Sequence, residues 1–224
     1  NSTRCCSYTS MRAGIVIYNA EGVTIDNVHF YETYIGIMTY FANSLEVKNS
    51  EFDRGTISSH NSALYLYYGT NMEIKNNVIQ KYQYGMYLYY TQAGLEVYDN
   101  HIHNSTSYGI YTQRLQYGSA SDPYEFKRNI FADNNYGFYS YGYSGSSYNR
   151  YFVFEDNTFR SSSNYQLYGY YYGQDWIIEN NTFDGDSDST YGLYLDRSYN
   201  TKIGNNTFTG HGTKDMYLRY CGTG

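Results

Sequence analysis

The sequence predicts an all-β fold, a single-domain β-solenoid of about nine coils with repeats of 22–29 residues. Two interleaved patterns of apolar residues recur along the chain, and an asparagine returns at the same place in six copies. The tyrosine-rich composition continues from end to end without a linker or charge block. Because each copy is short and alternates apolar with polar residues, the copies are typical of strands rather than helices.

The first pattern is an alternating segment that ends on an apolar residue. Its copies are VTIDNVHF (23–30), LEVKNSEF (45–52), MEIKNNVI (72–79), LEVYDNHI (95–102), YEFKRNIF (124–131), FVFEDNTF (152–159), WIIENNTF (176–183) and TKIGNNTF (201–208). Side chains on a strand alternate between its two faces. We therefore expect the third residue of every copy to point inward in one column: Ile25, Val47, Ile74, Val97, Phe126, Phe154, Ile178 and Ile203.

The second pattern reads aromatic-Gly-apolar-Tyr and alternates with the first. Its apolar residues are Ile15, Ile37, Leu64, Met86, Ile110, Phe138, Leu167, Leu193 and Met216. A unit of two or three short strands cannot bury its inner face alone. Successive units must therefore stack and share one continuous core.

An asparagine column supports this stacking. The sixth position of the first pattern is asparagine in six consecutive copies: Asn77, Asn100, Asn129, Asn157, Asn181 and Asn206. Asparagine tolerates the left-handed backbone of a sharp corner, and stacked amides can form hydrogen bonds from coil to coil. We expect a ladder of these residues at a corner of the solenoid.

These repeats resemble the right-handed parallel β-helix family over roughly residues 13 to 220. Similar repeats occur in pectin and alginate lyases, polygalacturonases, NosD-like proteins and disaggregatase-like surface proteins. Because functions differ so widely within this family, the resemblance implies the architecture alone. We expect an N-terminal arm over residues 1–12, a β-helix over 13–220 and a C-terminal end over 221–224.

Charge and composition exclude several function classes. The net charge of −6 and the absence of a basic cluster give no footprint for nucleic acid. No apolar run is long enough to span a membrane, and the chain starts at Asn1 without a leader. We expect a mature segment of an extracellular or cell-surface protein.

One outer face is predicted to be covered with tyrosine. The residue after the core position of the second pattern is Tyr65, Tyr87, Tyr111, Tyr139, Tyr168, Tyr194 and Tyr217, and two residues further on stand Tyr18, Tyr40, Tyr67, Tyr89, Tyr141 and Tyr170. Tyrosine is a good strand former, which explains part of this bias. A contiguous aromatic face also indicates a surface that binds another copy or a sugar polymer.

Charged side chains are predicted to line another outer face. One column holds Glu46, Glu73, Glu96 and Glu125, and the column two residues along holds Lys48, Lys75 and Lys127. Opposite charges on neighbouring strands offset the repulsion within each column. We interpret this face as solvated, with an acidic substrate-binding or metal site as the alternative.

The three cysteines lie near the two extremes of the chain. Cys5 and Cys6 precede the first repeat, and Cys221 follows the last. Nine coils extend about 43 Å, whereas the Cα atoms of a disulfide lie within about 7 Å. We expect these cysteines to link neighbouring molecules or to leave a thiol unpaired.

Candidate catalytic residues gather at the corner after the first pattern: Asp53, Arg54, Lys81, His103 and Asp133. A lyase needs a base and a cation for its substrate, and an inverting hydrolase needs two carboxyl groups. Such charges also occur in ordinary turns, and the insertions are too short to wall a groove. A separate tripeptide, Gly210-His211-Gly212, resembles the Gly-His-Gly of polygalacturonases, but the other residues of that site are missing.

Two smaller features predict a cation and a modification. Asp184, Asp186 and Asp188 resemble the start of a calcium loop, although Ser189 stands where that loop needs glycine, and a polar turn is the alternative. No other cofactor is expected. Asn1, Asn104, Asn180 and Asn205 begin glycosylation triplets, and Asn104 is the expected carrier because we place it in a looser turn.

These observations favour an extracellular structural protein that assembles with copies of itself into a filament, sheath or surface array. The contacts would be the tyrosine face and the open coil ends, whose unpaired strand edges invite pairing. The alternative is a carbohydrate-binding or adhesive module, and a polysaccharide lyase or glycoside hydrolase is the least favoured reading.

Overall fold

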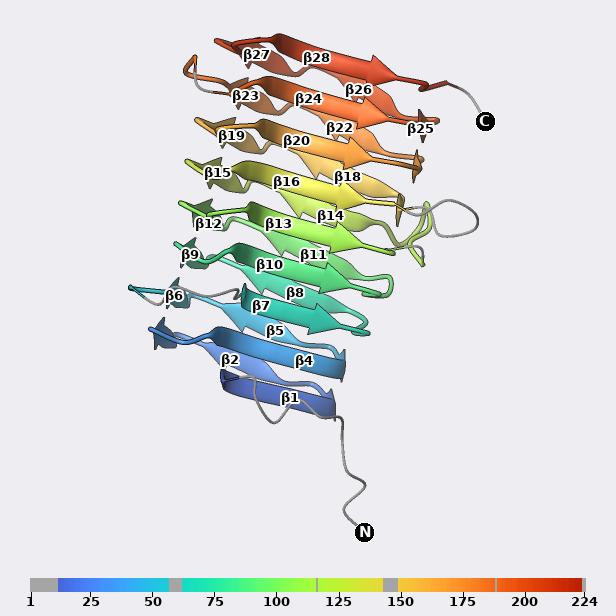
Figure 1. Cartoon of the computed structure of the whole chain (residues 1–224). Coiled ribbons are helices and arrows are strands. Elements are labelled where there is room, and N and C mark those ends of the chain that lie inside the picture. Colours follow the sequence, from blue (N-terminus) through green and yellow to red (C-terminus); the bar gives the residue numbers. More distant parts are fainter. Residues whose placement is uncertain (1–11, 57–61, 116, 143–148, 188, 223–224) are drawn as a thin grey trace.

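The structure, a computed structural model, describes residues 12–56, 62–115, 117–142, 149–187 and 189–222. Within these residues every regular element is a strand, and the 28 strands form three long sheets and one short one. Figure 1 shows the strands stacked in successive coils, with β1 at one end of the stack and β28 at the other.

Sheet A contains β1 (Ala13–Glu21), β4 (Ile35–Asn43), β7 (Ser62–Tyr67), β10 (Tyr84–Tyr89), β13 (Tyr108–Gln113), β16 (Tyr136–Tyr141), β20 (Tyr165–Tyr170), β24 (Tyr191–Asp196) and β28 (Lys214–Arg219). Sheet B contains β2 (Thr24–Asp26), β5 (Glu46–Lys48), β8 (Met72–Lys75), β11 (Leu95–Tyr98), β14 (Tyr124–Lys127), β18 (Phe152–Glu155), β22 (Ile177–Glu179) and β26 (Lys202–Gly204).

Sheet C contains β3 (His29–Tyr31), β6 (Glu51–Asp53), β9 (Val78–Gln80), β12 (His101–His103), β15 (Ile130–Ala132), β19 (Thr158–Arg160), β23 (Thr182–Asp184) and β27 (Thr207–Thr209). The short sheet contains β17 (Asn149–Arg150), β21 (Gly173–Gln174) and β25 (Ser198–Tyr199).

Each coil contributes one strand to each long sheet, and all pairings between these strands are parallel. Sheet A has nine strands, whereas sheets B and C have eight each, so eight coils are complete within the described residues. This is the parallel β-helix that the repeats predict.

The core is a set of inward columns, one or two from each sheet. The predicted sheet B column pairs in register from Ile25 to Ile203, and Val47, Ile74 and Phe154 in it are fully buried. Ile203 is only partly buried, because the last coil has no described coil on its outer side. In sheet C, phenylalanine rings stack between coils, with 4.6 Å between the ring centroids of Phe131 and Phe159.

The asparagine ladder is present and connects every coil from Asn77 to Asn206. In one rung the backbone N–H and the side-chain Nδ2 of Asn129 both donate to Oδ1 of Asn157, at 2.9 and 3.2 Å. The same Nδ2 also donates to the carbonyl oxygen of Val97 at 2.8 Å. Ser50 continues the ladder by one coil, since its N–H donates to Asn77 Oδ1. Buried corner groups are thereby paired.

The expectation that the ladder residues themselves adopt the left-handed backbone is wrong. The residue before each of them has the positive φ, at 51° to 57°: Asn76, Asp99, Arg128, Asp156, Asn180 and Asn205. The corner needs two different properties. A left-handed residue turns the chain outward to solvent, and the next residue sends its amide inward to bond along the stack.

Candidate functional site

Three columns of tyrosine cover the outer face of sheet A, and we call them together the Tyr field. The two predicted columns pair in register. The first contains Tyr65, Tyr87, Tyr111, Tyr139, Tyr168, Tyr194 and Tyr217. The second contains Tyr18, Tyr40, Tyr67, Tyr89, Tyr141 and Tyr170, and Gln113 occupies its position between Tyr89 and Tyr141. Strand alternation explains this placement, because Leu88 between Tyr87 and Tyr89 is fully buried.

The third column was not predicted from the sequence. It consists of Tyr84, Tyr108, Tyr136, Tyr165 and Tyr191, which pair in register at the start of their strands. These residues are the aromatic position of the aromatic-Gly-apolar-Tyr pattern, in which Gln166 replaces the glycine after Tyr165. The pattern therefore marks these residues in the sequence. The glycine breaks the alternation of the strand, so the sequence alone does not show on which face of the sheet the aromatic ring lies.

The rings of the Tyr field stack on one another. Ring centroids are 4.9 Å apart for Tyr65 and Tyr87, 5.0 Å for Tyr87 and Tyr111, and 5.5 Å for Tyr111 and Tyr139, with interplanar angles of 12°, 30° and 9°. Further along, Tyr168 turns perpendicular to Tyr194. Stacking covers the ring faces, so the partly buried rings present their outer edges and hydroxyl groups to solvent.

A row of aromatic residues at one edge supports the second column. Phe41, Tyr68 and Tyr90 have φ of 58°, 52° and 51°, which bulky residues rarely adopt. Each ring meets its chain neighbour edge-on, as Tyr68 does with Tyr67 at a centroid distance of 4.5 Å. This contact offsets the backbone strain and fixes the edge of the field. Its sequence signal is the aromatic doublets Tyr40-Phe41, Tyr67-Tyr68 and Tyr89-Tyr90.

The Tyr field is electrically neutral over most of its length. Strands β4, β7, β10, β13, β16 and β20 contain no Asp, Glu, Lys or Arg. Burial, and then the neighbouring Tyr84, raises the pKa of Tyr87 to about 12. Burial likewise raises the pKa of Tyr111 and Tyr139. The phenols therefore stay protonated and can both donate and accept hydrogen bonds at neutral pH.

Sheet B carries the predicted charge pattern on its outer face. Lys48 Nζ lies 2.8 Å from Glu46 Oε2, and Lys75 Nζ lies 2.8 Å from carboxylate oxygens of both Glu46 and Glu73. Hydrogen bonds from Lys48 and then Lys75 lower the pKa of Glu46 to about 2. The pattern fails at Glu96, because Tyr98 stands where the two adjacent coils have Lys75 and Lys127. Burial, and then the charges of Glu125 and Glu73, raise the pKa of Glu96.

Replacing Glu96 with glutamine should raise the melting temperature at pH 7 by roughly 1 °C, since the change removes one repelled surface charge. A raised pKa in the fold means that ionisation of Glu96 destabilises the fold above that pKa. Below the unfolded pKa of about 4.3 the group is protonated in both states, so the gain should vanish by about pH 3. Thermal unfolding of both proteins across this range measures the effect; an equal gain at both pH values would contradict it.

The predicted catalytic corner is partly assembled. Lys81 Nζ lies 3.2 Å from both carboxylate oxygens of Asp53. Burial acts to raise the pKa of Asp53, but hydrogen bonds from Gly55 N–H and Lys81 outweigh it and lower the pKa. Asp53 and Lys81 thus neutralise each other in an ion pair that also occurs in ordinary turns.

The rest of that corner is dominated by histidine. The rings of His101 and His103 stack with centroids 4.4 Å apart, and Nδ1 of His103 lies 2.8 Å from Asn104 Nδ2. Burial lowers the pKa of His103, although the charge of Asp133 opposes this. Arg54 belongs to the same corner, but its Nε is buried without a hydrogen-bond partner.

His211 is a structural residue in this fold. Its side chain is fully buried, with Nδ1 2.8 Å from Asp215 Oδ1 and Nε2 3.0 Å from Gln166 Oε1. The imidazole therefore connects β20 to β28 across two coils. The Gly-His-Gly tripeptide is explained by this packing.

The predicted cation and disulfide residues lie partly outside the described residues. Oδ1 of Asp184 accepts from Asp186 N–H and from Thr209 Oγ1, at 3.4 and 3.2 Å, while Asp188 is not described. In the part of the chain that is described, no three His, Cys, Asp or Glu side chains form a metal-binding group. Cys5 and Cys6 also lie outside it. Burial raises the pKa of Cys221, whose Sγ lies 3.5 Å from the carbonyl oxygen of Leu195.

Among the candidate glycan sites in the described residues, Asn104 lies in the longest connection between strands, as expected. Asn104 is exposed at a left-handed corner with φ of 56°, and its N–H donates to the carbonyl oxygen of Ala132. Asn180 and Asn205 are also exposed, with φ of 57° and 53°. Asn104 begins the connection 104–107 between β12 and β13, whereas Asn180 and Asn205 lie in the shorter connections 180–181 and 205–206. Asn1 is outside the described residues. Which of them carries a glycan stays a prediction.

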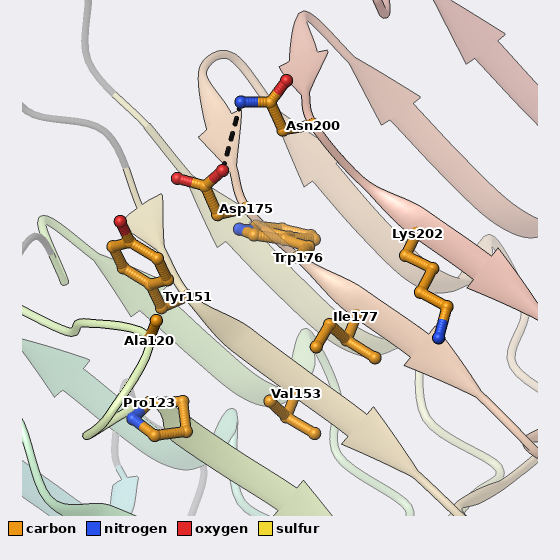
Figure 2. A pocket seen from close by; sticks show the side chains of 9 residues that line it. All are labelled: Ala120, Pro123, Tyr151, Val153, Asp175, Trp176, Ile177, Asn200 and Lys202. Atoms are coloured by element: carbon orange, nitrogen blue, oxygen red, sulfur yellow. Dashed lines mark hydrogen bonds between the residues drawn. The ribbon is translucent and has the colours of Figure 1, made fainter. Parts of the chain in front are cut away.

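A hollow of about 340 Å³ lies on the outer side of sheet B, beside the long connection between β13 and β14 that contains Ala120 and Pro123. Its walls are Ala120, Pro123, Tyr151, Val153, Asp175, Trp176, Ile177, Asn200 and Lys202. Figure 2 shows Val153 and Ile177 between Pro123 and Lys202, with Asp175 and Asn200 at the rim. The rim groups are bonded to each other, since Asn200 Nδ2 donates to Asp175 Oδ1 at 3.2 Å. The hollow offers room for one small ring above an apolar floor.

Comparison with known proteins agrees with the coil architecture. A family model described as "Right handed beta helix region" matches residues 1–114 and again residues 115–224. No curated protein matches the chain. Among the described residues no helix is long and apolar enough to cross a membrane. The two matches together cover the chain, and the parallel strands of sheets A, B and C form the successive coils expected of a β-helix. The chain therefore belongs to the right-handed β-helix family.

Proposed function

We propose that the protein is an extracellular structural β-solenoid whose copies associate through the Tyr field. The observation that carries this proposal is the neutral, tyrosine-covered face formed by β4 to β20, which lies on a fold whose other outer faces bear charge. Protein interfaces are depleted in charge at their centre and enriched in tyrosine. Stacked rings are already fixed in place, so docking immobilises few side chains.

The geometry of the rings favours a second copy over a sugar polymer. A sugar stacks on the exposed face of an aromatic ring, but most faces in the Tyr field are covered by the ring of the next coil. What remains is a rigid surface of ring edges and hydroxyl groups, each able to donate and accept. A second Tyr field presents the same groups and is complementary to the first in the manner of an isologous interface.

Contacts at the first and last strands of sheet A are a second part of the proposal. Val16 in β1 is 62 % exposed, and Met216 and Leu218 in β28 are 42 % and 46 % exposed. Strand edges with apolar side chains pair readily with further strands, whether of the same chain or of another copy. Association through the Tyr field can be tested by substitutions that leave β1 and β28 unchanged.

Replacing Tyr87, Tyr111 and Tyr139 together with serine should weaken association on the order of 100-fold, because tyrosines at the centre of an interface dominate its energy. Sedimentation velocity over a concentration series measures this, and circular dichroism checks that the strands persist. The rings point away from the core, so the fold should be retained.

The matched control is Thr158, Thr182 and Thr207 replaced together with alanine. These residues form a column in register on the outer face of sheet C. The control should associate like the parent chain. Unchanged association of the serine variant would contradict the proposal, and a loss of polysaccharide affinity instead would favour a binding module.

A further inference from the structure

The oxidisable side chains that reach solvent on the outer face of sheet A are the phenols of the Tyr field. Elsewhere in the described residues, the exposed oxidisable side chains include Met216, Tyr31, Tyr117 and Tyr220. Met72, Met86 and Trp176 are at most 1 % exposed, so the thioethers and the indole of the core are shielded. By contrast, the rings of the Tyr field keep their outer edges and hydroxyl groups at the surface. A one-electron oxidant in solution therefore meets phenols first on this side of the molecule.

Neighbouring phenols are close enough to share a radical. Centroids lie 4.7 Å apart for Tyr40 and Tyr67 and 5.2 Å for Tyr67 and Tyr89. A phenoxyl radical on one ring can take a hydrogen atom from the hydroxyl group of the next phenol. The radical can then move along the column from the residue that was oxidised first, and it persists until two radicals combine.

Two radicals within one column are poorly placed to join. A dityrosine bond connects the carbons next to the two hydroxyl groups and lies in the plane of each ring, so the rings must meet edge to edge. Tyr65 and Tyr87 meet face to face at 12°, and Tyr168 meets Tyr194 edge to face at 82°. Parallel backbones about 4.8 Å apart keep the rings stacked. Coupling inside a column would require both rings to leave the stack.

We propose that oxidation of the Tyr field joins separate copies through dityrosine bonds and forms few such bonds within one chain. The inference rests on the proposed association, in which ring edges of one copy face ring edges of another. With hydrogen peroxide and a haem peroxidase, two phenols each lose one electron and one proton. The two radicals form one carbon–carbon bond, the two ring hydrogens shift to the oxygens, and the peroxide becomes two waters.

The test is treatment of the full chain with hydrogen peroxide and a haem peroxidase at two concentrations. One concentration is chosen where sedimentation shows association and the other where it shows monomers. Denaturing gels and peptide mass spectrometry then measure covalent multimers and locate the dityrosine bonds. We expect multimers in the associated sample and at least a tenfold lower yield in the dilute one. Abundant dityrosine within single chains of the dilute sample would overturn the inference.

Phenylalanine variants separate ring stacking from phenol chemistry. Replacing Tyr87, Tyr111 and Tyr139 together with phenylalanine keeps the stacked rings but removes three central hydroxyl groups, and should at least halve the multimer yield. Tyr31→Phe is the control, because Tyr31 is 58 % exposed in sheet C and lies outside the Tyr field. Equal yields from the two variants would refute the assignment. Association without dityrosine multimers overturns this inference alone, whereas a chain that never associates overturns both proposals.

Discussion

Replacing Asn129 with alanine should lower the free energy of unfolding by about 3 to 5 kcal/mol, because several buried polar groups lose their partners at once. The side chain is fully buried. Its Oδ1 accepts from the backbone N–H and the Nδ2 of Asn100, and its Nδ2 donates to Val97 and Asn157. Alanine leaves the Asn100 N–H and the Val97 carbonyl buried without these bonds.

Denaturant unfolding followed by circular dichroism measures this loss, and Lys127→Ala is the matched control. Lys127 lies two residues away and forms ion pairs with Glu125 and Glu155 at the surface. Its replacement should change the free energy of unfolding by no more than about 1 kcal/mol. If the two variants unfold at the same denaturant concentration, the ladder does not stabilise the fold as argued.

Replacing Phe154 with alanine should lower the free energy of unfolding by about 3 to 5 kcal/mol. The ring is fully buried at the centre of the core. It stacks on Phe126 at 5.2 Å and meets Phe138 edge-on at 4.8 Å. Parallel strands on both sides hold the neighbouring rings in register, so the surroundings cannot collapse into the cavity.

Two further variants show whether the loss arises from the cavity. Phe154→Leu keeps most of the volume and should lower the free energy of unfolding by less than about 1.5 kcal/mol. Ile203→Ala removes a partly buried residue from the same column in the last coil and should have a smaller effect than Phe154→Ala. Equal losses in Phe154→Ala and Ile203→Ala would contradict the continuous core described above.

The coils and their register could be predicted because each column repeats one chemical requirement many times. A single inward residue such as Val47 says little, but eight apolar residues at matching positions can be satisfied only by stacking. The backbone of the corner could not be predicted in the same way. Asn76 and Asn77 are the same residue type with opposite roles, and only the local dihedral angles distinguish them.

The candidate site could be predicted only where its residues follow the repeat. Tyr87 and Tyr89 follow strict alternation, whereas Tyr84 is separated from them by Gly85 and its face depends on the close approach of Gly85 to the next coil. The hollow beside Trp176 is formed by an insertion, to which no repeat applies. His211 acquires its role from Gln166, which lies two coils away in the stack.

The sequential order of strands in sheet A has an evolutionary consequence. Among the described residues, each strand of sheet A pairs with its counterparts in the adjacent coils, and the first and last strands of the sheet do not pair with each other. Duplication of one complete repeat inserts a coil whose upper and lower surfaces match those already present. Such a duplication lengthens the asparagine ladder by one amide and the tyrosine surface by up to three rings. The reach of that surface can therefore change stepwise by gene duplication while its chemistry stays constant.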